Sequence, residues 1–503
     1  MGTEGVTAKV MTKPVRERKP FWKLVLHYFG ITGLAIGFAY EIIVLFIALI
    51  FKSDIADMII PFSISAIASI SLGLTLHILS GESRPLKLGE ALSISALIWL
   101  FIPAIGSLPF IISGHLDPLS AYFESMSGFT ATGLTMFSSV ESLPKSLLIW
   151  RSLIQWIGGV GIIVLFLTVL GREGTTSKLY FAEGRTDRIR PSAVSTARWV
   201  WAIYSFYTVI LSLLLILITR DAFKSINLSM TTLATGGFAV TDGSVASLDN
   251  PLAEGVIIFF MVIGATSFLL HYHVLVKGIH NPLGFWKFWR KKPVKEKMNR
   301  MLIYEFALMI LLAVAGLITV SWAEGWDLRG GIFQSFSAIT GTGLSNEDVQ
   351  NYRPISKTVL SLLMISGGCY GSTTSAIKSF RVLLLLCSVA WIVKRKLLPE
   401  AAIVPLRIGG RTYKDEDVMD VAVYIFLYMG ALIVGTLIFM GSGFGLENSL
   451  FEVASAQGNV GLSVGITKIG MPIYQKIVLM IEMWIGRLEI IPIFVLLRRL
   501  FPL

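Results

Sequence analysis

The sequence predicts an all-α integral membrane protein in which two extra N-terminal transmembrane helices precede four helical repeats around one pseudo-fourfold axis. Three observations support this fold class. The 503 residues are 54% hydrophobic and only 15% charged, with a mean hydropathy of +0.72, which is too apolar for a water-soluble chain. Apolar runs long enough to cross a bilayer recur along the chain. A short Thr/Gly signature returns four times between such runs.

Ten apolar runs of about 20 residues or more are predicted to span the membrane. They lie near 22–51, 57–80, 89–113, 145–171, 193–219, 251–278, 300–323, 356–391, 416–440 and 471–497. The first pair stands alone, and the other eight form four pairs. The first run follows a basic tail but lacks a small-residue cleavage site, so it is predicted to be a retained span rather than a signal peptide.

The Thr/Gly signature lies in the long connection of each of the four later pairs. Its copies are at 130–134 (TATGL), 234–238 (ATGGF), 341–344 (GTGL) and 457–462 (QGNVGL). Alignment of Gly133, Gly236, Gly343 and Gly461 places the copies 103, 107 and 118 residues apart. Before each copy is a helix-like stretch too short to span, which we expect to enter the membrane and return: 119–129, 222–233, 329–339 and 447–456.

Four irregular loops at membrane depth predict a shared pore. Such backbone survives only where protein buries it or where it lines a water-filled path, since each unpaired amide costs several kcal/mol. Rings of carbonyl oxygens could then replace the water shell of a monovalent cation. The predicted carbonyl ligands are those of Ala131, Thr132, Ala234, Thr235, Gly341, Thr342, Asn459 and Val460. One Thr-Gly after a helix is an ordinary C-cap, but its recurrence in four pairs favours a filter.

The repeats divide the chain into five segments. We expect a basic tail and two-helix extension at 1–85, followed by pore repeats at 86–175, 176–282, 283–398 and 399–503. Thirty of the 43 Lys and Arg residues lie in alternate loops that include both ends of the chain. This bias predicts cytoplasmic N and C termini and signature loops that open to the outside. The basic cluster at 287–297 is interpreted as a loop at the lipid surface, and no nucleic-acid partner is expected.

A glycine-rich segment interrupts the eighth run. It contains Gly367, Gly368 and Gly371 and continues through Ser372, Thr373, Thr374 and Ser375. Each glycine costs about 1 kcal/mol of helix propensity, so a continuous helix is not expected over 367–375. The alternative is a helix-packing face of small residues.

Basic residues also occur inside the late apolar runs. Arg487 lies halfway along the last run and is predicted to face inward, with snorkelling or pairing to Glu482 or Glu489 as the alternatives. Lys378 and Arg381 lie on one helical face, where we expect anchors or partner contacts, with snorkelling as the favoured explanation.

Five motifs carry a resemblance to a known family. They are 127–133 (SGFTATG), 151–164 (RSLIQWIGGVGIIV), 235–238 (TGGF), 459–461 (NVG) and 486–489 (GRLE). The chain resembles the Trk/Ktr/HKT superfamily of K⁺ uptake proteins along nearly its whole length, and most closely the TrkH branch. The unpaired first two spans also distinguish TrkH-like members from Ktr and plant relatives, which have eight spans.

The resemblance implies the function. It implies K⁺ uptake across the cytoplasmic (inner) membrane through one gated pore, with K⁺ at the filter carbonyls and no covalent cofactor. It also implies a homodimer that works with a cytosolic nucleotide-binding subunit of the TrkA type, besides the contact with membrane lipids. Glycine at all four filter positions is similar to K⁺-selective members, whereas Ser at the first position accompanies Na⁺ preference.

The resemblance also implies a gate. An intramembrane loop beneath the filter would close the pore, formed here by 367–375 and met by Arg487. The family usually has Gly-Gly where this chain has Ser375 and Ala376.

Two other function classes can be weighed. A secondary transporter, including a symporter that couples K⁺ to H⁺ or Na⁺, needs intramembrane carboxylates, but Glu41, Glu305 and Glu482 are isolated and lie outside the repeated signature. An enzyme is not expected, because His271 and His273 lack matching acidic or Cys ligands. Cys369 and Cys387, 18 residues apart in one helical run, are not expected to form a disulfide.

Overall fold

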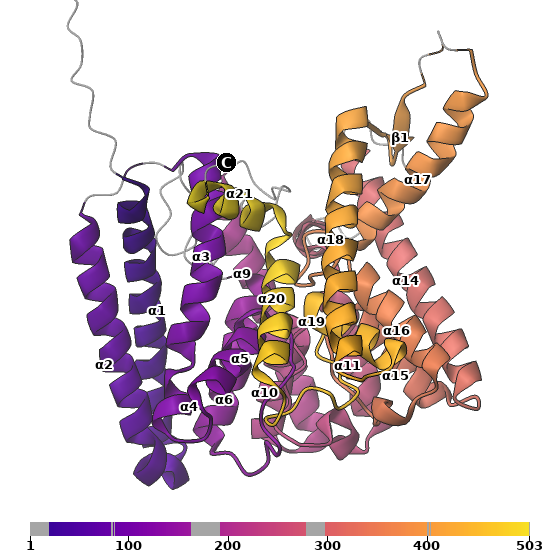
Figure 1. The fold of residues 1–503 in the computed structure, drawn as a ribbon. Helices are drawn as coiled ribbons and strands as arrows, with labels where there is room; N and C mark the ends of the chain where they lie inside the picture. Colours follow the sequence, from indigo (N-terminus) through magenta and orange to yellow (C-terminus); the bar gives the residue numbers. More distant parts are fainter. Residues whose placement is uncertain are drawn as a thin grey trace, which may run out of the picture.

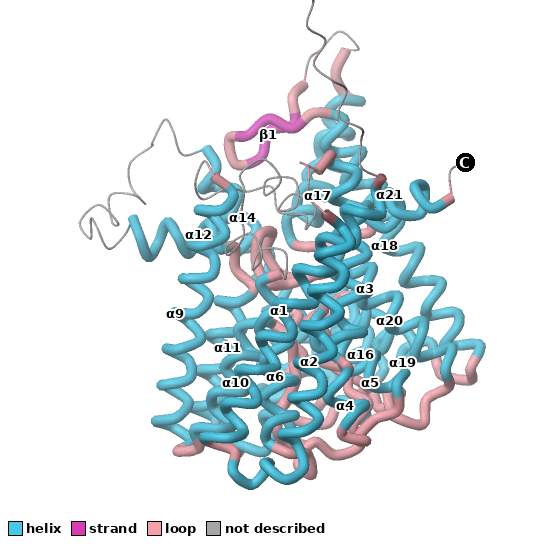
Figure 2. Tube along the Cα trace, turned by 90° about the vertical axis from the view of Figure 1, so that its left-hand side faces the viewer, coloured by secondary structure: helices cyan, strands magenta, loops and turns pink. Residues whose placement is uncertain are grey.

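The computed structural model describes residues 20–81, 84, 86–161, 192–277, 297–399, 402 and 404–501. The basic tail, the end of the fourth predicted span and most of the 287–297 cluster lie outside the described residues. The described chain is a bundle of helices, with a short β-hairpin that projects from one end (Figures 1 and 2). The hairpin pairs β1 (Leu406–Ile408) with β2 (Arg411–Tyr413) in antiparallel register.

The first two helices pack closely along their length at one side of the bundle (Figure 1). They are α1 (Phe21–Leu49) and α2 (Ile55–Ser80). Small residues allow the approach, since a β-carbon on Gly30 would lie 2.7 Å from the backbone nitrogen of His77. Arg499 near the C-terminal end lies over the ring of Phe21, at 4.4 Å from its centroid. The described ends of the chain therefore meet at one end of the bundle.

The remaining helices follow the order expected of four repeats. The first group contains α3 (Leu88–Gly106), α4 (Leu108–Ile112), α5 (Pro118–Phe129) and α6 (Lys145–Val160). The second contains α9 (Ala193–Thr219), α10 (Ala222–Ala234), α11 (Pro251–Gly264), α12 (Phe268–Tyr272) and a π-helical turn (His273–Lys277). The third contains α14 (Lys297–Ala323), α15 (Leu328–Ile339), α16 (Pro354–Ser366) and α17 (Ser379–Lys396). The fourth contains α18 (Asp415–Gly441), α19 (Leu446–Gln457), α20 (Ile473–Leu488) and α21 (Ile491–Leu500).

Six helical segments within the described residues are long and apolar enough to cross a membrane. They are Phe21–Leu49, Ile55–Ser80, Leu88–Ile112, Val194–Thr219, Arg300–Ala323 and Asp415–Gly441. Helices α11 and α12, which are bent by 100° at the break between them, make a seventh span if the pair is counted as one. The break in the eighth predicted span is confirmed, because α16 ends at Ser366 and α17 begins only at Ser379.

Two predicted spans are not the continuous helices that the sequence suggested. The sixth breaks after Gly264 because the 367–375 loop pairs with the break, where Cys369 N donates to Ala265 O at 2.9 Å and Phe268 N donates to Gly371 O at 3.1 Å. The tenth breaks at Glu489 and Ile490, which have φ values of 60° and 59°. Neither backbone conformation continues a right-handed helix.

The four short helices, α5, α10, α15 and α19, lie toward the end of the bundle opposite α21 (Figure 1). Three begin with an aspartate whose carboxylate accepts hydrogen bonds from the first-turn amides: Asp117, Asp221 and Asp327. Each helix ends directly before its Thr/Gly loop, so its C-terminal partial negative charge is close to that loop.

Candidate functional site

The four Thr/Gly loops share one backbone conformation. In each loop one amide donates to the carbonyl five residues earlier, at 2.8–2.9 Å. The residue before this amide has a φ between 51° and 64°, and the residue after it is a glycine with a φ between 72° and 100°. The donor amides belong to Thr132, Gly236, Thr342 and Val460, and the glycines that follow are Gly133, Gly237, Gly343 and Gly461.

These loops close into a circle. A β-carbon added to Gly133 would overlap the carbonyl oxygen of Gly236, and one added to Gly237 would lie 2.7 Å from the carbonyl oxygen of Thr342. A β-carbon on Gly343 would overlap Val460 O, and one on Gly461 would overlap Thr132 O. Each loop therefore presses one carbonyl against the glycine of the loop before it. The order runs from the first loop to the fourth and back to the first.

The second loop differs from the sequence alignment by one residue. Gly236 was aligned with the other filter glycines because it follows Thr235, but its backbone is equivalent to Thr132, and Gly237 holds the glycine position. The predicted carbonyl pair Ala234 and Thr235 is accordingly replaced by Thr235 and Gly236. The helix starts support this register, since Gly237 lies as far along the chain from Ala222 as Gly133 lies from Pro118.

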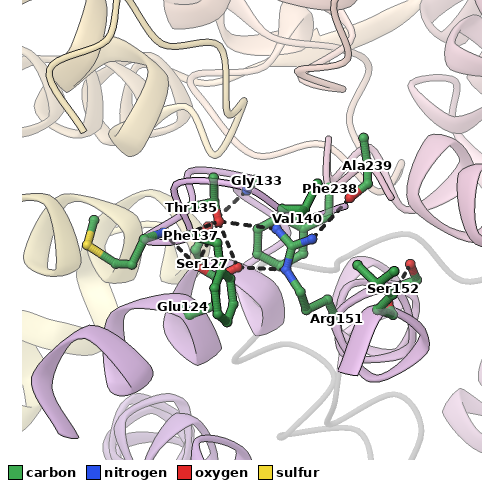
Figure 3. Close-up of polar contacts among 12 residues, drawn as sticks. Glu124, Ser127, Gly133, Thr135, Phe137, Val140, Arg151, Ser152, Phe238 and Ala239 are labelled. Carbon is green, nitrogen blue, oxygen red and sulfur yellow. Dashed lines mark hydrogen bonds and ion pairs between the residues drawn. The ribbon is translucent and has the colours of Figure 1, made fainter. Parts of the chain in front are cut away.

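Buried polar residues on the short helices hold the chain that follows the loops. Glu124 accepts hydrogen bonds from Met136 N at 2.7 Å and from the Thr135 hydroxyl, and it forms an ion pair with Arg151 at 2.8 Å (Figure 3). At the equivalent place in the fourth repeat, Glu452 accepts from Val464 N at 3.1 Å and from the Ser463 hydroxyl. Neither glutamate is among the site residues predicted from the sequence. Their common position, eight residues before Thr132 and Val460, is a signal that could have found them.

A vestibule of about 440 Å³ lies on one side of the ring and is lined by residues of all four loops. Asp242, Glu347 and Asp348 contribute carboxylates to its wall, which favour an approaching cation. Burial raises the pKa of Glu347; the hydrogen bond from Tyr352 opposes this shift, and the nearby Asp327 carboxylate adds to it.

On the other side of the ring, the 367–375 segment fills the space. A β-carbon on Gly341 would lie 3.9 Å from the Thr374 methyl group. The Thr373 hydroxyl donates to Gly264 O at 2.9 Å and accepts from the Thr235 hydroxyl at 3.1 Å. Only a small cavity, of about 30 Å³, remains on this side. Gly367, Gly368, Gly371 and Ser372 belong to the same segment, which is therefore closely packed beneath the ring.

Arg487 lies against this segment. Its guanidinium donates to Thr373 O at 3.1 Å, to Gly159 O at 2.9 Å and to Gly158 O. The side chain therefore joins the intramembrane loop to the end of α6. It points into the protein and does not extend toward the membrane surface.

Lys378 and Arg381 do not snorkel, so the favoured sequence interpretation of these two residues is wrong. Both form ion pairs with Glu489, with a Lys378 Nζ to Oε1 distance of 2.7 Å and an Arg381 Nη2 to Oε2 distance of 2.5 Å. All three side chains are about 10% exposed. Lys378 and Arg381 follow the intramembrane loop, and Glu489 lies at the break between α20 and α21. The cluster therefore joins two parts of the chain that are 111 and 108 residues apart in sequence.

The other residues weighed in the sequence are not brought together. Glu41, Glu305 and Glu482 lie on α1, α14 and α20, where Glu305 accepts from Tyr370 N at 3.2 Å and Glu41 is exposed. His271 is buried against Ile263 O and the Tyr207 hydroxyl. Cys369 and Cys387 are both free thiols. No group of three potential metal-ligating His, Cys, Asp or Glu residues occurs in the described part of the chain.

Comparisons with known proteins agree with this geometry. The model of the TrkH family, described as a cation transport protein, matches residues 60–502. An uncharacterized cation transporter of Methanocaldococcus jannaschii is 34% identical over 423 residues, which cover 84% of each chain. The Trk system potassium uptake protein TrkH of Escherichia coli K12 is 30% identical, over 84% of this chain and 87% of that protein. The crystal structure of the potassium transporter TrkH from Vibrio parahaemolyticus aligns with a TM-score of 0.80 at 25% identity, over 95% of this chain and 98% of that one.

Proposed function

Because the chain belongs to the TrkH family of cation transport proteins, we propose that it is the membrane subunit of a K⁺ uptake system and passes K⁺ through the ring of four loops. The relatives named as Trk potassium uptake proteins support K⁺ as the ion. The closed circle of glycines and carbonyls is the observation that carries the mechanism. Four loops that each present backbone oxygens at one place can replace the water shell of K⁺.

The proposed filter ligands are the carbonyls of the ring and of the residues just before it. In the corrected register these are Ala131, Thr132, Thr235, Gly236, Gly341, Thr342, Asn459 and Val460. The side chain of Asn459 supports their alignment, since its amide donates to the Thr132 hydroxyl at 2.8 Å and to Met483 O at 3.0 Å. The first and fourth loops are thereby held together at the level of the ring.

We expect Gly133→Ser to raise Na⁺ permeability relative to K⁺. The new side chain would strain a backbone with φ near 99° and push against the carbonyl of Gly236. A shift of about 1–2 kcal/mol would change the permeability ratio by about 5- to 30-fold. The ratio can be measured from cation fluxes into liposomes. A ratio equal to that of the unaltered protein would contradict the filter assignment.

Transport is proposed to be gated by the 367–375 loop together with Arg487. The near absence of space beneath the ring supports a closed arrangement. Movement of the loop would have to break the Arg487 contacts and the ion pairs of Glu489, so both would resist opening.

The remaining proposals concern assembly and placement. We propose that the chain is a multi-pass protein of the cytoplasmic membrane, with both ends and the Glu489 cluster toward the cytoplasm, and that it forms a homodimer controlled by a cytosolic nucleotide-binding subunit of the TrkA type. The charge bias and the meeting of Phe21 with Arg499 support the common side of the two ends. The domain boundaries at 85, 175, 282 and 398 are proposed as the limits of the extension and the four repeats.

A further inference from the structure

One face of α6 lies along the second filter loop, although the helix and the loop belong to different repeats. Arg151, Gln155 and Gly159 are spaced by four residues and so lie on one side of the helix. Arg151 donates to Ala239 O at 3.0 Å and covers the Phe238 ring at 4.1 Å (Figure 3). A β-carbon on Gly159 would lie 2.8 Å from the Cα atom of Ala234. This face therefore contacts both ends of the loop.

Gln155 contacts the centre of the same loop. Its Nε2 donates to Gly236 O at 2.5 Å, and its Oε1 accepts from Phe238 N at 3.0 Å. The side chain is fully buried. A backbone N–H can only donate, so Oε1 must face Phe238 and the amide group must face the carbonyl. The two bonds hold Gly237 from both sides.

The carbonyl that Gln155 binds is a member of the filter ring. Gly236 O is equivalent to Thr132 O, Thr342 O and Val460 O, the oxygens that lie against the neighbouring glycines. A carbonyl oxygen has two lone pairs, so one hydrogen bond from Gln155 leaves the other lone pair for an ion. The amide thus fixes the position of one oxygen in the ring and withdraws charge from it.

Equivalent positions in two other repeats carry no such amide. A β-carbon on Gly158 would overlap Phe129 O, one on Gly486 would overlap Gln457 O, and one on Gly264 would lie 3.1 Å from Leu233 O. These three carbonyls are each three residues before a ring carbonyl, so the three glycines correspond. The residues three positions before Gly158, Gly486 and Gly264 are Gln155, Met483 and Met261, respectively.

We propose that Gln155 is a positioning residue that sets the ion specificity of the pathway by holding the Gly236 carbonyl in the ring. The inference rests on the proposed K⁺ filter and names a determinant of its selectivity outside the loops. It also gives a role to the part of the 151–164 motif that lies in α6. Without Gln155 the second loop loses the hydrogen bonds on both sides of Gly237.

The test compares cation permeability of full-length variants in liposomes. Gln155→Leu removes both hydrogen bonds, and Gln155→Glu keeps the acceptor for Phe238 N but loses the donor to Gly236 O. We expect both variants to raise Na⁺ permeability relative to K⁺ by about fivefold, as the loss of one net hydrogen bond at an ion ligand would do. Asn227→Leu, which also removes a buried amide in the second repeat but one bonded to Phe223 O of its own helix, is the matched control and should keep the original ratio.

The outcomes separate this inference from the proposed function. If the unaltered protein prefers K⁺ and a folded Gln155→Glu variant keeps the same ratio, the positioning role is contradicted while the filter stands. If the unaltered protein does not discriminate between K⁺ and Na⁺, the filter itself is contradicted. Should Gln155→Leu fail to elute as a single species in size-exclusion chromatography, the nearly isosteric Gln155→Glu decides the matter.

Discussion

Gly343→Ala is expected to abolish selective K⁺ flux. The residue has a φ of 72°, which strains any residue with a β-carbon, and that atom would overlap the carbonyl oxygen of Val460. The overlap is with backbone, so a change of rotamer cannot relieve it. Strain and displacement together cost more than about 3 kcal/mol if the ring is kept, so we expect K⁺ flux to fall by about 100-fold or more. Radiotracer Rb⁺ uptake into liposomes measures this loss.

Gly255→Ala is the matched control for this prediction. Gly255 lies in α11, and a β-carbon there would meet nothing within 4 Å. The same chemical change is therefore expected to leave flux unaltered, because alanine is favoured over glycine in a helix. If Gly343→Ala conducts K⁺ as well as Gly255→Ala, with the same preference over Na⁺, the ring of glycines is not the conducting site.

Arg487→Gln is expected to raise the basal K⁺ flux. The guanidinium holds Thr373 O of the intramembrane loop and two carbonyls at the end of α6, and hydrogen bonds of a charged donor contribute about 1.5–3 kcal/mol each. Loss of even one such contribution would shift the closed arrangement toward opening by about tenfold or more. The measurement is Rb⁺ uptake by the purified subunit alone, without any cytosolic partner.

Arg498→Gln makes the same change of charge at an exposed position of α21 and should leave basal flux unchanged. This control separates a gating effect from a general change in surface charge. A basal flux of Arg487→Gln that equals or falls below that of Arg498→Gln would show that Arg487 does not hold the pathway closed.

The order of helices could be predicted from sequence, because a long apolar run by itself indicates a helix in an apolar environment. The recurrence of the Thr/Gly signature indicates the repeat. The bends could not. The break after Gly264 depends on hydrogen bonds from Cys369 and Thr373, more than 100 residues later in the chain. A helix can break in the membrane where another segment forms hydrogen bonds with the freed backbone groups. Without such a segment, the same residues would be expected to form a continuous helix.

The position of the shared loop conformation was predictable in three of the four loops. In the second, Thr235 and Gly236 match the letters of Thr132 and Gly133, but the backbone is equivalent one residue later, at Gly237. The sequence specifies the side chains, whereas the ring is defined by the backbone φ angles and by the directions of the carbonyl groups. The ion cluster of Glu489 was not predictable for a related reason, since apolar surroundings alone do not reveal which distant carboxylate will neutralise Lys378 and Arg381.

The measurement that tests the central claim most directly is cation flux into liposomes that contain the purified protein, with gradients of K⁺, Rb⁺, Na⁺ and Li⁺ compared. Four loops that replace the water shell of K⁺ should pass K⁺ and Rb⁺ well above Na⁺ and Li⁺, without any proton gradient. Equal fluxes of all four ions, or flux only when a proton gradient is imposed, would contradict a carbonyl filter and would indicate a carrier.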